Sequence, residues 1–146
     1  METGDRLMAY WLFKSEPDVF GWDDLVARGD KGEEWDGVRN YQARNNMRAM
    51  KIGDLGLFYH SNIGKEMVGI LKVIETAHPD STTDDPRWEC VDVRAVRPLP
   101  RPVSLDQARS EPRLADMVLV NNSRLSVQPV TDAEWAVLME LSGADD

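Results

Sequence analysis

The segment from Trp35 to Arg48, WDGVRNYQARNNMR, gathers side chains that could bind a nucleic-acid base and its phosphates. Its last ten residues, 39–48, hold three Arg, three Asn and no acid, in a chain whose formal net charge is -9. Guanidinium groups bind phosphate oxygens, and an aromatic ring can stack on a flat heterocycle. A turn at Asp36-Gly37 separates the ring from the basic residues. The segment therefore predicts one small basic site beside an aromatic wall.

The five tryptophans fall into three groups by their neighbours in the sequence. Trp35 is flanked by acidic residues and a glycine turn, so we expect it at a polar rim, with one ring face open to a flat ligand. Trp22 and Trp88 stand at junctions between loops and regular elements and could add a second wall, although the core is the commoner place for such residues. Trp11 and Trp135 lie in apolar runs and are expected in the core.

Two polar strand ends could supply hydrogen bonds to the edge of a heterocycle. In YHSN, residues 59–62, Ser61 and Asn62 offer a donor and acceptor pair, but both residue types are also common in hairpin turns, and the motif alone favours a turn. KSEP, residues 14–17, is similarly either a charged, hydroxyl-bearing strand end or a turn before Pro17.

Metal binding and a cofactor are not expected. The chain has two histidines, His60 and His78, and a single cysteine, Cys90, with no paired spacing of zinc ligands. Cys90 stands in the middle of a strand-like run, where a buried, inert thiol is typical. The sequence also lacks a glycine-rich phosphate loop.

An enzymatic function is weakly supported. There is no nucleophile elbow of the G-x-S-x-G type. Lys14, Glu16, Asp36 and His60 are of suitable types for acid–base catalysis, but a salt bridge or a turn cap is the commoner role of each. We therefore expect a non-catalytic protein.

The composition limits the kinds of partner. With 26 acidic against 17 basic residues, the chain is a poor candidate for coating a long duplex, which depends mainly on Lys and Arg at phosphates. No run approaches the length of a membrane span, and the N-terminus has no apolar signal core. A single cysteine excludes an internal disulfide, so a reducing, cytoplasmic setting is expected.

The hydrophobic pattern predicts an α+β fold, a small barrel of five to six short strands with peripheral helices. Prolines at 98–102 are expected to end the sheet pattern. In helix 39–50, Ala43, Met47 and Met50 form an apolar stripe, and Ser104 and Thr131 open capping boxes of later helices. Strands are expected at 9–14, 55–61, 67–77, 87–96 and 125–130, with a brief one within 32–37 before the Asp36-Gly37 turn. Helices are expected at 22–29, 39–50, 104–110 and 131–143. Residues 8–142 form one predicted domain, after an extension or alternative start at 1–7 and before a tail at 143–146.

Six strings resemble the EVE domain family, in order and in approximate spacing: WLFKSEPDVF, EWDGVRNYQARN, GDLGLFYHSN, VGILKV, PRW and LSVQPVT. The resemblance runs from Met8 to Leu141. This is a PUA-like family that is also similar to the YTH readers of modified RNA. It implies a compact PUA-type barrel with a pocket for one modified base. EVE domains are associated with methylated or hydroxymethylated cytosine in DNA, and YTH domains with methylated adenine in RNA.

The resemblance also implies roles for residues at the matching positions. Trp35 would be the aromatic wall, and Arg39 and Asn40 would face the sugar–phosphate or the base edge. The pocket floor and rim would be formed by His60, Ser61, Asn62, Lys14 and Ser15. The chain departs from the family in a short segment before PRW and in Asn121-Asn122-Ser123, where many members have a basic turn.

The expected partner is thus nucleic acid with a modified base, bound by a monomer. Arg44, Arg48 and Lys51, one basic stripe of the predicted helix, would contact phosphates. Two alternatives remain: an enzyme acting on a modified nucleoside, and a sensor of a free nucleoside or other small metabolite.

Overall fold

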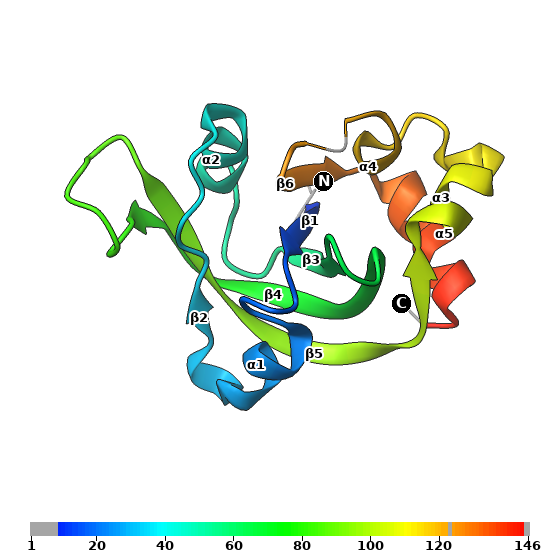
Figure 1. Ribbon diagram of the computed structural model, residues 1–146, viewed down its shortest axis with the longest axis horizontal. Coiled ribbons are helices and arrows are strands. Elements are labelled where there is room, and N and C mark those ends of the chain that lie inside the picture. Colours follow the sequence, from blue (N-terminus) through cyan, green and yellow to red (C-terminus); the bar gives the residue numbers. More distant parts are fainter. Residues whose placement is uncertain (1–8, 123, 145–146) are drawn as a thin grey trace, which may run out of the picture.

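The computed structural model describes residues 9–122 and 124–144 (Figure 1). The predicted extension, residues 1–7, lies outside the described residues, as do Met8, Ser123 and residues 145–146 of the tail. Among the described helices, none is long and apolar enough to cross a membrane.

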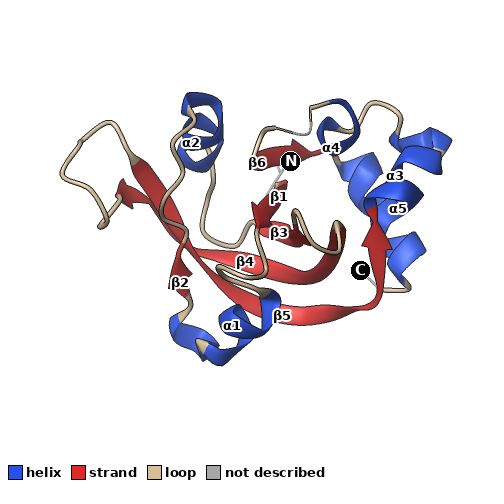
Figure 2. Ribbon diagram, in the orientation of Figure 1, coloured by secondary structure: helices blue, strands red, loops and turns tan. Residues whose placement is uncertain are grey.

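The fold is mixed α+β and is built on one six-stranded sheet, in the order β2-β5-β4-β3-β1-β6 (Figure 2). Strand β1 runs parallel to β3, and the other neighbouring pairs are antiparallel. The strands are β1 (Tyr10–Ser15), β2 (Glu33–Glu34), β3 (Leu55–His60), β4 (Glu66–Pro79), β5 (Glu89–Ser104) and β6 (Val127–Val130).

The predicted class and number of strands are confirmed, but the sheet is not closed into a barrel. Strands β2 and β6 stand at its two edges and are not paired with each other. Strand β2 is only two residues long, and both of its residues pair with β5, at Asp92 and Val93. A strand this short cannot also form a ladder with β6 on the far edge.

Strand β5 does not end at the prolines, as the sequence led us to expect. It continues to Ser104, with Pro98 opposite Gly69 of β4. Proline has no N–H to donate, so it is tolerated where one side of a strand has no ladder. This part of β5 meets that condition, because β2 pairs only with Asp92 and Val93 on the other side.

The helices mostly follow their local signals. The helix predicted at 39–50 is shorter, because Asn40 is extended and its side chain accepts the Ala43 N–H at 2.8 Å as N-cap. The capping boxes at Ser104 and Thr131 are confirmed, and Gly143 ends the last helix in the left-handed conformation. The helices are α1 (Trp22–Ala27), α2 (Tyr41–Arg48), α3 (Leu105–Ser110), α4 (Val118–Asn121) and α5 (Asp132–Ser142), with 3-10 turns at Gly29–Lys31 and Pro112–Leu114. Helix α4 and the two 3-10 turns were not predicted.

Two apolar cores lie against the sheet, and β1 contributes to both. Phe13 belongs to the core that also receives α1 and α2, whereas Leu12 belongs to the core covered by α3, α4 and α5. This follows from strand geometry, because successive side chains point to opposite faces. Trp11 and Trp135 are buried as predicted, and so is the apolar stripe Ala43, Met47 and Met50.

Candidate functional site

A cavity of about 630 Å³ lies between the end of β1, the following loop and the segment from β2 to Arg39. This volume is within the usual range of small-molecule sites. Four of the predicted site residues border it: Lys14, Ser15, Trp35 and Arg39. The other lining residues are Glu16, Val19, Phe20, Arg28, Glu33, Glu34, Asp36, Gly37, Val38 and Ser126.

Trp35 is mostly a core residue whose remaining surface borders the cavity. Its side chain is 7% exposed, and its ring meets Phe13, Phe20 and Phe58 edge-on, with centroids 5.2, 6.3 and 5.5 Å away. The backbone N–H of Trp35 also donates to the Val91 carbonyl at 2.8 Å. The ring is therefore held rigidly in place, but less of it faces solvent than its polar sequence neighbours suggested.

Lys14 and Ser15 reach the cavity from the end of β1. Burial lowers the pKa of Lys14, whose ammonium lies 5.8 Å from the centroid of the Tyr59 ring. The Ser15 hydroxyl donates to the Phe20 carbonyl at 2.6 Å. Because its hydrogen is used within the chain, Ser15 can offer a ligand only its oxygen lone pairs.

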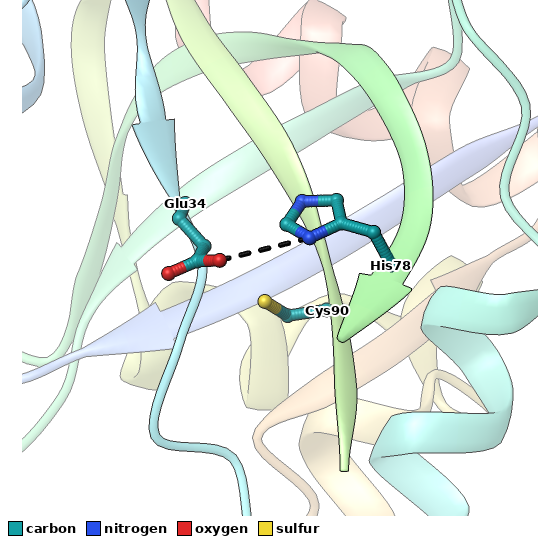
Figure 3. Close-up of side chains that lie close together, drawn as sticks. All are labelled: Glu34, His78 and Cys90. Carbon is teal, nitrogen blue, oxygen red and sulfur yellow. Dashed lines mark ion pairs between the residues drawn. The ribbon is translucent and has the colours of Figure 1, made fainter. Parts of the chain in front are cut away.

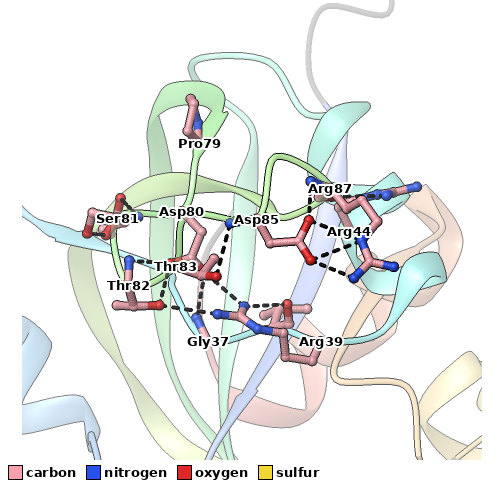
Figure 4. A network of polar contacts seen from close by, with 12 residues as sticks. Gly37, Arg39, Arg44, Pro79, Asp80, Ser81, Thr82, Thr83, Asp85 and Arg87 are labelled. Atoms are coloured by element: carbon pink, nitrogen blue, oxygen red, sulfur yellow. Dashed lines mark hydrogen bonds and ion pairs between the residues drawn. The ribbon is translucent and has the colours of Figure 1, made fainter.

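Asp80, which the sequence gave no reason to single out, organises the turn after Trp35 (Figure 4). Its carboxylate accepts the Gly37 N–H at 2.9 Å and the Arg39 guanidinium at 3.1 Å, and both the backbone and the hydroxyl of Thr82 donate to it. Burial alone would raise the pKa of Asp80, but these hydrogen bonds from Thr82, Gly37 and Arg39 lower it to about 2. The buried carboxylate thus fixes Arg39 at the rim of the cavity.

The cavity wall carries several carboxylates, whereas the sequence predicted a basic site beside the aromatic wall. Two of its cations are paired, Arg28 with Glu33 at 2.7 Å and Arg39 with Asp80. Burial, reinforced by the charges of Asp80, Glu34 and Glu33, raises the pKa of Asp36. Carboxylate oxygens are hydrogen-bond acceptors, so this wall suits a ligand edge rich in N–H groups more than it suits an anion.

The residues of the predicted YHSN motif lie outside the cavity lining. The ring of His60 accepts the backbone N–H of Trp22 at 3.1 Å, and burial lowers its pKa. The backbone N–H of Ser61 donates to Ser15, and Asn62 has a φ of 74°, which is typical of a tight turn. These contacts give the motif a structural role in the β3–β4 hairpin and in anchoring α1.

Asn40, Trp22 and Trp88 are also placed elsewhere. Asn40 caps α2. Trp22 packs so closely over Gly69 that an added Cβ there would lie 2.4 Å from its ring. The Trp88 ring stacks on Tyr41, with centroids 5.0 Å apart, and the Arg39 guanidinium lies 5.5 Å from it. None of these three residues lines the cavity, so their contact with a base stays a prediction.

The basic stripe is placed on α2 and just after it, outside the cavity lining. Arg44 donates to the Arg87 carbonyl at 3.0 Å, and Arg48 pairs with Glu89 at 2.5 Å. Lys51 is exposed. Two of the three cations are thus tied to the segment leading into β5, and their role as phosphate contacts stays a prediction.

A second cluster joins three residues that the sequence gave no reason to connect. One ligand atom each of Glu34, His78 and Cys90 lies within 4.8 Å of the other two (Figure 3). Cys90 is buried as expected, and burial, followed by the charges of Glu34, Asp80, Asp36 and Asp92, raises the pKa of its thiol. Among the described residues this is the group able to hold a metal ion, and sequence spacing could not reveal it, because the three residues come from three strands.

The chain matches the EVE domain over residues 9–141, and it therefore belongs to the EVE domain family. It is 37% identical to thymocyte nuclear protein 1 of Rattus norvegicus, over 97% of this chain and 77% of the relative.

Solved structures agree with this assignment. A protein from Agrobacterium tumefaciens superposes with a TM-score of 0.92 at 55% identity, covering 93% of this chain and 94% of the other. Human THYN1, crystallised in complex with DNA containing 5-methylcytosine, superposes with a TM-score of 0.85 at 35% identity, covering 94% and 99% of the two chains. A YTH domain from Zygosaccharomyces rouxii, at 15% identity and a TM-score of 0.57, shares the fold alone.

Proposed function

We propose that this protein is a non-catalytic module that reads a modified base in nucleic acid, and that the base is methylcytosine in DNA. The observation that carries the proposal is the likeness to human THYN1, which was crystallised with DNA containing 5-methylcytosine and aligns with 94% of this chain. The cavity beside Trp35 supports the proposal, because its volume of about 630 Å³ is in the range of small-molecule sites.

The chemistry of the cavity wall supports cytosine as the ligand. Cytosine presents an amino group as donor, and carboxylates accept from it. Asp36 and Glu16 border the cavity and provide such acceptors. Val19, Phe20 and Val38 line it as well and offer apolar contact to a methyl group at C5. The wall thus has partners for the two groups that define methylcytosine.

A site that reads one extruded base must offset the free-energy cost of extrusion. Removing a base from a duplex costs a few kcal/mol, and an aromatic contact returns about 1–3 kcal/mol. The base must therefore be held by additional hydrogen bonds and by some contacts to phosphate. Arg39, fixed by Asp80 at the cavity rim, can provide one such contact.

The test is a calorimetric titration with short oligonucleotides that carry cytosine, methylcytosine, hydroxymethylcytosine or N6-methyladenine, in single and double strands. We expect selective binding of methylcytosine and a clear loss of affinity in Trp35→Phe, which alters the cavity wall but keeps an aromatic ring in the core. Trp22→Phe is the matched control, since Trp22 is equally buried but does not line the cavity.

Two outcomes would contradict the proposal. One is equal affinity for modified and unmodified oligonucleotides. The other is an equal loss of affinity in Trp35→Phe and Trp22→Phe, which would place the ligand away from the cavity. Free nucleosides that bind as tightly as oligonucleotides would support a metabolite sensor instead.

The non-catalytic part of the proposal has its own measurement. A reader leaves its ligand unchanged, so chromatography of modified nucleosides and oligonucleotides after incubation should recover them intact. Any time-dependent product that requires the folded protein would support the enzymatic alternative. The cytoplasmic setting stays a prediction from the cysteine content.

A further inference from the structure

We infer that Glu34, His78 and Cys90 form a binding site for a divalent transition metal with the preferences of zinc, which ties strand β2 to the β4–β5 pair. The inference does not depend on the proposed base-reading function, because His78 and Cys90 lie outside the cavity lining and the test uses no nucleic acid.

Strand register brings the three residues together. His78 of β4 is the ladder partner of Cys90, and Glu34 of β2 is the partner of Asp92 on the other side of β5. Cys90 and Asp92 are two positions apart on β5 and so share one face of the sheet. The side chains of three strands consequently converge on one point, with the Glu34 carboxylate 3.6 Å from Nδ1 of His78 (Figure 3).

The donor set is one that zinc accepts. Thiolate sulfur, imidazole nitrogen and carboxylate oxygen all bind Zn²⁺, at about 2.0–2.3 Å, which puts tetrahedral ligand atoms about 3.3–3.8 Å apart. The Glu34–His78 separation is already in this range. The largest separation is at most 4.8 Å and requires shifts of about 1 Å, which side-chain rotation can supply. Three protein ligands leave a fourth position for water.

His78 is oriented as metal-bound histidines usually are. Its Nε2 lies 2.7 Å from the Asp92 carboxylate, and Nδ1 points toward Glu34. A carboxylate on the far nitrogen fixes the ring and the tautomer, which leaves the near nitrogen's lone pair for the metal. Nδ1 is also 3.0 Å from the Pro79 carbonyl oxygen, so it faces two oxygens and requires either a proton or a cation between them.

The charges around the thiol favour a cation as well. The negative charges of Glu34, Asp36, Asp80 and Asp92 act on Cys90, whose own side chain is fully buried. A lone thiolate would be repelled there, whereas a divalent ion would be attracted to every one of these groups. Binding would release the thiol proton to solvent and form the metal–sulfur bond in its place.

A metal at this point would stabilise the strand that carries the cavity wall. Glu34 directly precedes Trp35, and β2 is held to the sheet by only two paired residues. The Trp35 backbone N–H to the Val91 carbonyl and the Ser81 contacts to the Glu34 carboxylate hold this segment as well. A bond from Glu34 through the metal to β4 and β5 would add a stronger attachment to these. Metal binding should therefore raise the thermal stability of the chain.

The test uses the full chain, dialysed against a chelator and then titrated with Co²⁺ and Zn²⁺ in the absence of nucleic acid. Because Cys90 is the only cysteine, a thiolate-to-cobalt charge-transfer band in the near ultraviolet reports on this site alone. We expect the band to saturate at one Co²⁺ per chain and to be displaced by Zn²⁺. Zinc at about 100 times its dissociation constant should raise the melting temperature by about 5–10 °C.

Variants separate this site from incidental binding. Glu34→Gln and His78→Gln should weaken cobalt binding at least tenfold while the circular dichroism spectrum stays unchanged, and Cys90→Ala should abolish the band. Glu75→Gln, which removes an exposed carboxylate from β4 outside the cluster, should bind as the parent chain does. The inference is overturned if the folded parent chain gives no thiolate band. It is equally overturned if the band persists undiminished in His78→Gln and Glu34→Gln. Cobalt would then bind Cys90 without these two residues, and a proton, not a metal, would lie between Nδ1 of His78 and its oxygen neighbours.

Discussion

Trp35 combines two roles that a single substitution to alanine cannot separate. Its ring packs against three phenylalanines, and removing a buried tryptophan ring costs about 3–5 kcal/mol of folding free energy. Loss of binding in Trp35→Ala would therefore report partly on unfolding. This is why the binding test uses phenylalanine at Trp35, with Trp22→Phe as its control.

Asp80 is the residue at which we expect the clearest dependence of stability on pH. Its pKa is lowered from an ordinary value of 3.8 to about 2, so the folded state is stabilised by about 2 kcal/mol when the carboxylate is ionised. Because the shift is downward, this stability is present above the unfolded pKa and is lost as the pH falls through about 2.

The expected result is that Asp80→Asn lowers the free energy of unfolding at pH 7 by about 2 kcal/mol, with a difference from the parent that shrinks between pH 4 and pH 2. Urea denaturation at several pH values measures it. Asp84→Asn, an exposed carboxylate in the same loop, should differ little from the parent at any pH. A difference for Asp80→Asn that stays constant down to pH 2 would show that ionisation is not its cause.

At the scale of elements, α2 depends on a single side chain for its start. Asn40 accepts the Ala43 N–H and thereby satisfies a donor that the helix itself leaves unpaired. Replacing such a cap with alanine typically costs about 1 kcal/mol. Since α2 buries Ala43 and Met47 in the core, the cost should appear in the stability of the whole fold.

We therefore expect Asn40→Ala to lower the free energy of unfolding by about 1 kcal/mol in thermal or urea denaturation. Gln42→Ala, at an exposed position inside the same helix, should be neutral or slightly stabilising, because alanine is the better helix former. If the two variants were equally stable, capping by Asn40 would be without energetic importance.

At the scale of the whole molecule, the net charge of -9 decides how the chain meets a polyanion. Its overall field repels a nucleic acid backbone, so contact must depend on a few local cations. Arg48 is already paired with Glu89, and Arg44 with the Arg87 carbonyl, so each must share or exchange its partner to bind phosphate.

The corresponding prediction concerns Arg44, Arg48 and Lys51 replaced together by Glu. Affinity for an oligonucleotide should fall far more than affinity for a nucleoside, and the slope of log K against log salt should flatten by about 0.9 for each lost duplex phosphate contact. Titration at several salt concentrations measures both. The control is the triple variant Lys65→Glu, Lys72→Glu and Arg109→Glu, which makes the same charge change elsewhere. An equal loss of affinity in both triple variants would show that phosphate binding does not depend on Arg44, Arg48 and Lys51 in particular.

The sequence by itself determined the features that depend on near neighbours along the chain. The capping boxes at Ser104 and Thr131, the end of the last helix at Gly143 and the apolar stripe Ala43, Met47 and Met50 were all predicted and found. Each of these features is satisfied within one or two helical turns, so the residue types alone carry the information. The long strings shared with the EVE domain likewise identified the family.

Only the tertiary structure decided how distant residues meet. The parallel pairing of β1 with β3, the burial of Trp35 and the clamp from Asp80 to Gly37 and Arg39 all join parts of the chain that are far apart in sequence. The meeting of Glu34 with His78 and Cys90 is of the same kind. Strand register selects these contacts, and register is settled by the packing of the whole sheet, because a shift of one residue would turn every side chain to the opposite face.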